Sequence, residues 1–95
     1  MIALAVTWMA KEGREARVAE VFRYLQAESR KEAGCRQFQV HRHLEDRRRF
    51  FIYEQFDDEA ALEAHRAAPH FASHAKIELP QVADRVDGQR YEPLV

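Results

Sequence analysis

The chain has 95 residues, of which 46% are hydrophobic and 33% are charged, a balance typical of a globular domain and unlike that of a disordered or membrane-embedded chain. With 15 Lys and Arg against 16 Asp and Glu, the formal net charge is −1, which argues against nucleic-acid binding because phosphate contacts need a basic surplus. The dense basic run Arg47–Arg49 fits a hairpin turn better. This length predicts one domain covering residues 1–95.

Cysteine content and the N-terminus bear on the compartment. Cys35 is the single cysteine, which excludes an intrachain disulfide and a multi-cysteine metal site and suits a reducing environment. The apolar residues 1–6 are too few to span a bilayer, which takes about 20 apolar residues. No basic segment precedes them and no small-residue cleavage motif follows. We therefore expect a cytoplasmic protein.

The first two predicted elements are a strand and a helix. Residues 2–9 form a strand-like stretch in which both alternating rows are mostly apolar, so both faces should be covered. Residues 14–33 predict a helix with a narrow apolar stripe and a charged solvent side that includes Glu32. Gly34 stands where a left-handed C-terminal cap belongs. Such a helix is expected to lie on one face of a sheet.

Two alternating stretches, residues 37–44 and 48–56, predict a hairpin with its turn at Glu45-Asp46. If the turn has two residues, Glu54 lies on the same sheet face as His41. A change of one residue in the register would move Glu54 to the other face, because side chains alternate along a strand.

The second half of the chain predicts two short helices. The acidic pair at residues 57–58 is expected to cap a helix over residues 59–66. Pro69 is well placed to start a second helix that reaches about residue 78, and Pro80 should end it.

The last strand is expected to start at residue 86 or 89 and to end near residue 93. The order is then strand, helix, strand, strand, helix, strand. This is the ferredoxin-like βαββαβ plan of the α+β class, an antiparallel sheet with its helices on one face. The opposite face of the sheet is partly apolar, so we expect a partner subunit to cover it.

Several short motifs occur in a fixed order along nearly the whole chain: Gly13, Glu32-Ala33-Gly34-Cys35, Tyr53-Glu54-Gln55-Phe56, Ala61-Leu62 with His65, Pro69-His70-Phe71, and Tyr91-Glu92-Pro93-Leu94. In these motifs the chain resembles the antibiotic biosynthesis monooxygenase family, small dimeric α/β-barrel proteins that include quinol monooxygenases. The resemblance implies a homodimer whose two sheets close a barrel, and a ligand cavity between the sheet and the helices of each subunit. It does not fix the reaction, since relatives include oxygenases, haem-degrading enzymes, isomerases and members without known activity.

The predicted catalytic residues are Glu54, His65 and His70. An imidazole with a pKa near neutral can take a proton from a phenol or quinol. The resulting anion can pass an electron to O₂ without a flavin or a metal. In this scheme His65 or His70 is the base, and Glu54 orients an imidazole or accepts a substrate hydroxyl. The sequence thus predicts a monooxygenase of small quinols or phenols that needs no cofactor.

Aromatic and imidazole side chains are expected to bind the substrate, because they would hold a flat ring and exclude water. These residues are Trp8, Phe38, His41, Phe50, Tyr53, Phe71 and His74. Two other interpretations stay open: each histidine could serve a structural hydrogen bond, and the aromatic residues could belong to the core. The alternative function is a non-oxidative small-ligand binder or an isomerase on the same dimeric barrel.

Metal and haem chemistry are not predicted. His41 with His43, and His70 with His74, have spacings that a metal could use, but no cysteine joins them and no HExxH motif occurs. Haem-degrading relatives are expected to carry an asparagine on the first strand and a tryptophan at the end of the third. This chain has neither that asparagine nor that tryptophan at the corresponding positions.

Overall fold

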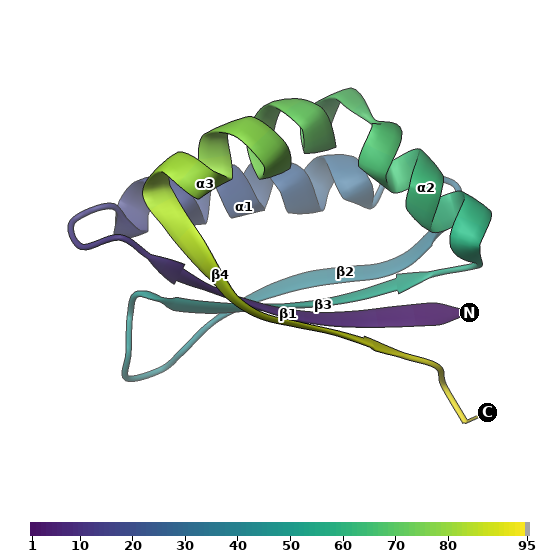
Figure 1. Ribbon diagram of the computed structural model, residues 1–95, viewed down its shortest axis with the longest axis horizontal. Coiled ribbons are helices and arrows are strands. Elements are labelled where there is room, and N and C mark those ends of the chain that lie inside the picture. The colour runs from purple at the N-terminus through teal and green to yellow at the C-terminus, as the bar shows by residue number, and fades with distance from the viewer. Residues whose placement is uncertain (95) are drawn as a thin grey trace.

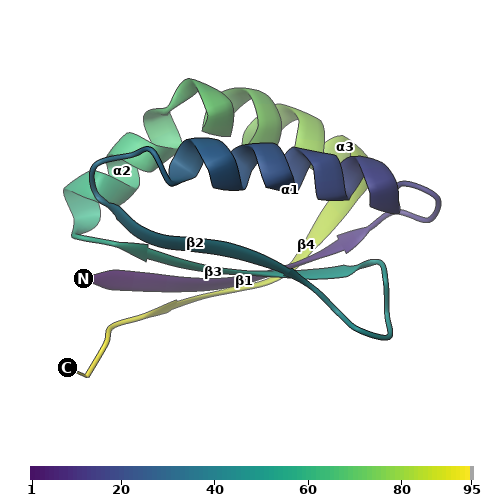
Figure 2. The ribbon, with the colours of Figure 1, turned by 180° about the vertical axis from the view of Figure 1, so that it is seen from behind.

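In residues 1–94, which the computed structural model describes, a four-stranded antiparallel sheet carries the helices on one face (Figure 1). The elements are β1 (Ile2–Ala10), α1 (Glu15–Ser29), β2 (Cys35–Arg42), β3 (Arg49–Phe56), α2 (Glu59–Ala67), the π-helix η1 (Phe71–Glu78), α3 (Leu79–Val82) and β4 (Ala83–Tyr91). The strand order is β2-β3-β1-β4. Seen from behind, α1 lies on the same side of the sheet as α2 and α3 (Figure 2). The predicted ferredoxin-like α+β fold is confirmed.

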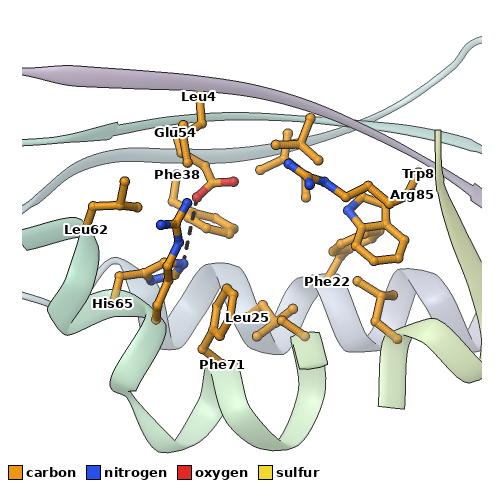
Figure 3. Close-up of a pocket in the computed structure, with 15 residues that line it drawn as sticks. Leu4, Trp8, Phe22, Leu25, Phe38, Glu54, Leu62, His65, Phe71 and Arg85 are labelled. Carbon is orange, nitrogen blue, oxygen red and sulfur yellow. Dashed lines mark ion pairs between the residues drawn. The ribbon is translucent and has the colours of Figure 1, made fainter. Parts of the chain in front are cut away.

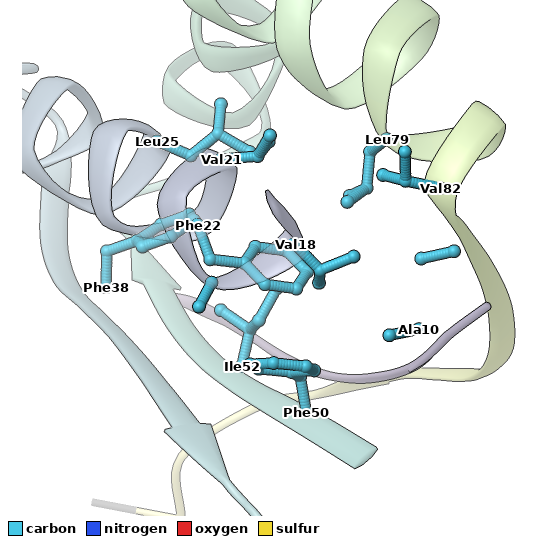
Figure 4. Packing of buried hydrophobic residues seen from close by; sticks show 12 residues of the cluster. Ala10, Val18, Val21, Phe22, Leu25, Phe38, Phe50, Ile52, Leu79 and Val82 are labelled. Atoms are coloured by element: carbon cyan, nitrogen blue, oxygen red, sulfur yellow. The ribbon is translucent and has the colours of Figure 1, made fainter. Parts of the chain in front are cut away.

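The core lies between α1 and the helix-covered face of the sheet (Figure 4). The helical stripe of α1 is buried there, and Phe22 packs against Phe50 of β3 with 5.5 Å between ring centroids. A second, smaller cluster joins β1 to α2 through Leu4, Phe56 and Leu62. Burying such side chains stabilises a fold by about 1.5–3 kcal/mol each. The two clusters therefore fix both ends of the helical layer on the sheet.

The register of β2 and β3 differs from the predicted one by one residue. Glu54 lies opposite Phe38 and points to the helix side, whereas a two-residue turn would have turned it to the open side. The turn is longer than expected: the N–H of His43 donates to the carbonyl of Arg49, and residues 44–48 form the loop. This correction moves Glu54 into the space under the helices.

Two glycines have the backbone roles that their surroundings require. Gly13, with φ of 81°, makes the left-handed turn before α1. Gly34 does not have a positive φ, so the predicted left-handed cap is wrong, and α1 ends earlier, at Ser29. A Cβ at Gly34 would instead overlap the Cβ of Ala61. Gly34 is thus the point where the turn after α1 touches α2.

The second helical segment is longer than predicted. Pro80 does not end it: the helix runs through η1 into α3 and ends at Val82, after which β4 starts at once at Ala83. Pro80 is the second residue of α3, directly after the junction with η1. The π-helical segment η1 lies between α2 and α3 along the chain. Among residues 1–94 no helix is long and apolar enough to cross a membrane.

Candidate functional site

A cavity of about 210 Å³ lies between the sheet and the helices, next to α2 and η1 (Figure 3). Its wall is mostly apolar, with Trp8, Phe22, Phe38 and Phe71 as the aromatic residues. Glu54, His65, Arg66 and Arg85 are the charged or titratable residues in the same wall. An apolar cavity with a few converging polar groups is the usual form of a small-molecule site.

Glu54 enters the cavity from β3 and is buried. Burial raises the pKa of its carboxyl to about 7, although the positive charges of Arg66 and Arg85 act in the opposite direction. Glu54 can therefore carry a proton near neutral pH, which an exposed carboxyl does not. The group can donate a hydrogen bond in one form and accept one in the other.

His65 is held between two carboxyl groups. It lies on α2, whose N-terminus is capped by the side chain of Asp58. Its Nδ1 lies 2.9 Å from Oε2 of Glu32, and its Nε2 lies 3.8 Å from Oε1 of Glu54 (dashed in Figure 3). A carboxylate can only accept, so the ring hydrogen belongs on Nδ1 and the lone pair on Nε2. The imidazole thus directs its basic nitrogen towards Glu54 at the cavity wall.

Burial also sets the protonation of His65. Because it disfavours the charged imidazolium, it lowers the pKa of His65, while the hydrogen bond to Glu32 raises this pKa in part. The rings of Phe56 and Phe71 pack against the imidazole with centroids 4.8 and 5.0 Å away. His65 is therefore neutral and fixed in orientation near pH 7.

Glu32 was expected on the solvent side of the first helix, but it is half-buried and bridges two histidines. Its Oε2 also lies 2.6 Å from Nε2 of His70. His70 does not line the cavity, so its contact with the site runs through Glu32. Nothing in the helical pattern distinguishes Glu32 from other charged residues. Its place in the Glu32-Ala33-Gly34-Cys35 motif was the one available signal.

The same three groups are the ones that could hold a metal ion. The ligand atoms of Glu32, His65 and His70 lie within 4.8 Å of one another, and within residues 1–94 no other such group occurs. Hydrogen bonds of 2.9 and 2.6 Å already join the carboxylate to both imidazoles, so no metal is needed to explain the cluster.

The predicted substrate-binding residues divide among three places. Trp8, Phe38 and Phe71 line the cavity. Phe50 is packed in the core under α1. His74 packs against Tyr24 of α1 with 4.4 Å between ring centroids, and its Nε2 lies 3.8 Å from a carboxylate oxygen of Glu78. Phe50 and His74 are thus outside this cavity.

His41 and Tyr53 lie on the open face of the sheet. They line a hollow of about 740 Å³ together with Cys35 and Phe51. This hollow is larger than the cavity under the helices, but it is more open and more polar. The corrected hairpin register explains the separation, since His41 and Glu54 lie on opposite faces of the sheet.

Arg66 and Arg85 were not among the predicted site residues. Arg85 falls in the segment that was expected to be a connection before the last strand, so no direction could be assigned to its side chain. In the structure it belongs to β4 and lies opposite Trp8 of β1. Arg66 stood at the expected end of its helix, where a charged residue is ordinary.

The fold and the cavity define a ferredoxin-like α+β protein with a mostly apolar cavity between the sheet and the helices. The sequence model of the antibiotic biosynthesis monooxygenase family matches residues 1–76, and the chain belongs to this family. Membership supports a monooxygenase or small-ligand-binding role.

Solved structures agree with this assignment. A protein of Pseudomonas aeruginosa is 31% identical, with a TM-score of 0.91 over 99% of this chain and 94% of its own. A Bacteroides thetaiotaomicron protein, described as a possible oxidoreductase of unknown function, is 27% identical, with a TM-score of 0.87 over 95% of this chain and 94% of its own. A candidate antibiotic biosynthesis monooxygenase of Nitrosomonas europaea is 22% identical, covers all of both chains with a TM-score of 0.92, and supports the fold alone.

Proposed function

We propose that this protein is a monooxygenase that oxidises a small quinol or phenolic aromatic with O₂ and without a bound cofactor. One observation carries the proposal: His65, oriented by Glu32, directs Nε2 towards Glu54 at the wall of an aromatic cavity. Membership of the antibiotic biosynthesis monooxygenase family supports the reaction class.

In this mechanism His65 is the base. A substrate ring lies among Trp8, Phe38 and Phe71, which exclude water. The substrate hydroxyl gives its proton to Nε2 of His65. Glu54, partly protonated near pH 7, donates a hydrogen bond to the developing phenolate oxygen. His65 is chosen over His70 as the base because His65 lines the cavity, whereas His70 does not line it and contacts Glu32 instead.

The oxidation balances without a further reductant. The phenolate passes one electron to O₂, which gives a substrate radical and superoxide. Their recombination forms a carbon–oxygen bond and a peroxide. The O–O bond then breaks, one oxygen stays on the ring as a quinone carbonyl, and the other leaves as water. The two hydrogens of this water come from the substrate hydroxyl and from the attacked ring carbon.

We also propose that the protein is a homodimer formed through the open face of the sheet. That face carries Phe51, which is 39% exposed, beside the hollow lined by His41 and Tyr53. Aromatic residues are enriched in the buried centre of subunit interfaces.

Oxygen uptake with a panel of quinols and phenols tests the reaction. We expect uptake by flavin-free, chelator-treated protein, with water and not peroxide as the reduced product. His65→Gln should lower kcat/KM by about 10²-fold or more, the usual range for loss of a general base. The control Glu12→Gln changes an exposed residue in the turn before α1 and should leave kcat/KM unaltered. No uptake with any member, together with ligand binding unaffected by His65→Gln, would favour the non-oxidative binder or isomerase.

A further inference from the structure

Arg85 presents a guanidinium group to the cavity without a protein partner. Its side chain extends from beside Trp8 towards the middle of the cavity (Figure 3). Among residues 1–94 no acceptor forms a hydrogen bond or ion pair with this guanidinium. Arg90, on the same strand, is paired with Glu59 outside the cavity. Of these two arginines of β4, Arg85 is the one that presents an unpaired guanidinium to the cavity.

The local structure of β4 holds Arg85 in this place. An irregularity in the pairing of β1 with β4 brings both Arg85 and Gly88 to the helix side, opposite Trp8 and Val6. A Cβ at position 88 would overlap Nη2 of Arg85 and lie 2.6 Å from its Cζ. Gly88 thus leaves the space in which the guanidinium lies beside the cavity.

The charges around the cavity do not cancel. Arg66 also lines it, and its nearest carboxylate, Glu63, is 4.0 Å away and mostly exposed. Glu54 is the single carboxyl group in the cavity wall within residues 1–94, and its pKa is raised to about 7. The lowered pKa of His65 keeps the imidazole neutral. Two guanidinium groups therefore face at most a partial negative charge.

We propose that Arg85, assisted by Arg66, makes the cavity selective for an anionic ligand, namely a single-ring phenol or quinol that carries a carboxylate. A guanidinium binds a carboxylate through two parallel hydrogen bonds, which fixes the ring as well as the charge. A cavity of about 210 Å³ suits one ring, since about 150 Å³ is enough for benzene. That the ligand is a substrate rests on the proposed function. That an anionic ligand binds in this cavity does not depend on it.

Calorimetric titration under anaerobic conditions tests this preference without turnover. The probes are 2,5-dihydroxybenzoate and its neutral amide, 2,5-dihydroxybenzamide, which have the same ring and the same hydroxyl groups. Trp8 is the only tryptophan in the sequence and lines the cavity, so a change in its fluorescence reports that binding is at this site. We expect the benzoate to bind at least about tenfold more tightly than the amide.

Three variants assign the preference to Arg85. Arg85→Gln should bind the two probes equally. Gly88→Ala should weaken the preference, because the new methyl group displaces the guanidinium. Arg90→Gln, the control on the same strand, should keep the full preference. The proposal is overturned if the native protein binds both probes equally or if Arg85→Gln retains the preference. If the native protein prefers the benzoate and Arg85→Gln does not, but no oxygen uptake occurs, the proposed reaction is refuted and the anion site stands.

Discussion

Nδ1 of His65 lies 2.9 Å from Oε2 of Glu32, and this contact determines which ring nitrogen faces the cavity. The two residues come from different parts of the fold: Glu32 follows α1, and His65 lies in α2. Since the carboxylate accepts the Nδ1 hydrogen, Nε2 keeps its lone pair. In the proposed mechanism Glu32 is therefore a positioning residue, one that would act on a substrate through His65 and does not itself line the cavity.

Glu32→Gln should change the pH dependence of the proposed reaction. Activity requires neutral His65, so kcat/KM should fall on acidification through the pKa of His65, which lies below the ordinary value of 6.5. Glu32 raises this pKa in part, so its removal should move the acid limb to lower pH. Loss of orientation should also reduce kcat/KM about tenfold at pH 8. Glu20→Gln, an exposed control on α1, should change neither quantity. An acid limb that stays in place would show that Glu32 does not act on His65.

Glu54→Gln should remove a pH dependence of stability. The pKa of Glu54 in the folded protein is about 7 against 4.5 in the unfolded chain, so the folded state binds the additional proton between these values. The contribution of Glu54 to the free energy of unfolding is therefore present below about pH 4.5 and is lost as pH rises through 7. This pKa difference corresponds to a loss of about 3 kcal/mol in the free energy of unfolding, because one pKa unit is equivalent to about 1.36 kcal/mol.

Urea unfolding between pH 5 and 8 measures this effect as the difference between the native protein and Glu54→Gln. Taking the difference is necessary because the lowered pKa of His65 has the opposite sign and acts below pH 6.5. Glu45→Gln, in the exposed hairpin loop, provides the control. Parallel curves for the native protein and Glu54→Gln would place the Glu54 carboxyl in water.

The first three strands and α1 could be predicted because their patterns follow directly from burial on one or two faces. The predicted start of the last strand at residue 86 or 89 was wrong: β4 starts at Ala83, and its residues after Ala83 are exposed and show no such pattern. The register of the hairpin could not be predicted, since it depends on the length of the loop. Nδ1 of His43 accepts the backbone N–H groups of Glu45 and Asp46, and these local bonds stabilise the longer loop. No alternation of apolar residues carries that information. The one-residue error in the predicted register placed Glu54 on the open face of the sheet, whereas the structure has it on the helix side.

Part of the site was visible in the sequence because Glu54 and His65 lie on neighbouring elements. Glu32 is 33 positions before His65, and only the packing of the turn after α1 against α2 brings them together. Arg85 depends on an irregularity in β4 and on the space at Gly88. Long-range contacts and bulges of this kind leave no periodic pattern, so they had to come from the structure.

Phe51→Glu should convert the proposed dimer into a monomer. A carboxylate at this position would be buried between the paired sheets, and an unpaired buried charge is costly at an interface. Ile77→Glu is the matched control, because Ile77 is 63% exposed on the helical side of the molecule. Sedimentation velocity at micromolar concentration measures both. A monomeric native protein, or a dimer that persists in Phe51→Glu, would exclude this face as the interface.

Gly34→Ala should separate α2 from the turn that carries Glu32. The new methyl group would overlap the Cβ of Ala61, and an overpacked contact of this kind costs about 1–3 kcal/mol of stability. The backbone at Gly34 suits alanine, so the cost arises from this contact alone. The double variant Gly34→Ala, Ala61→Gly restores the space. It should be more stable than the sum of the single changes predicts, even though a glycine within α2 costs about 1 kcal/mol. Strictly additive costs in urea unfolding would show that Gly34 and Ala61 are not in contact, and that His65 and Glu32 are brought together by other means.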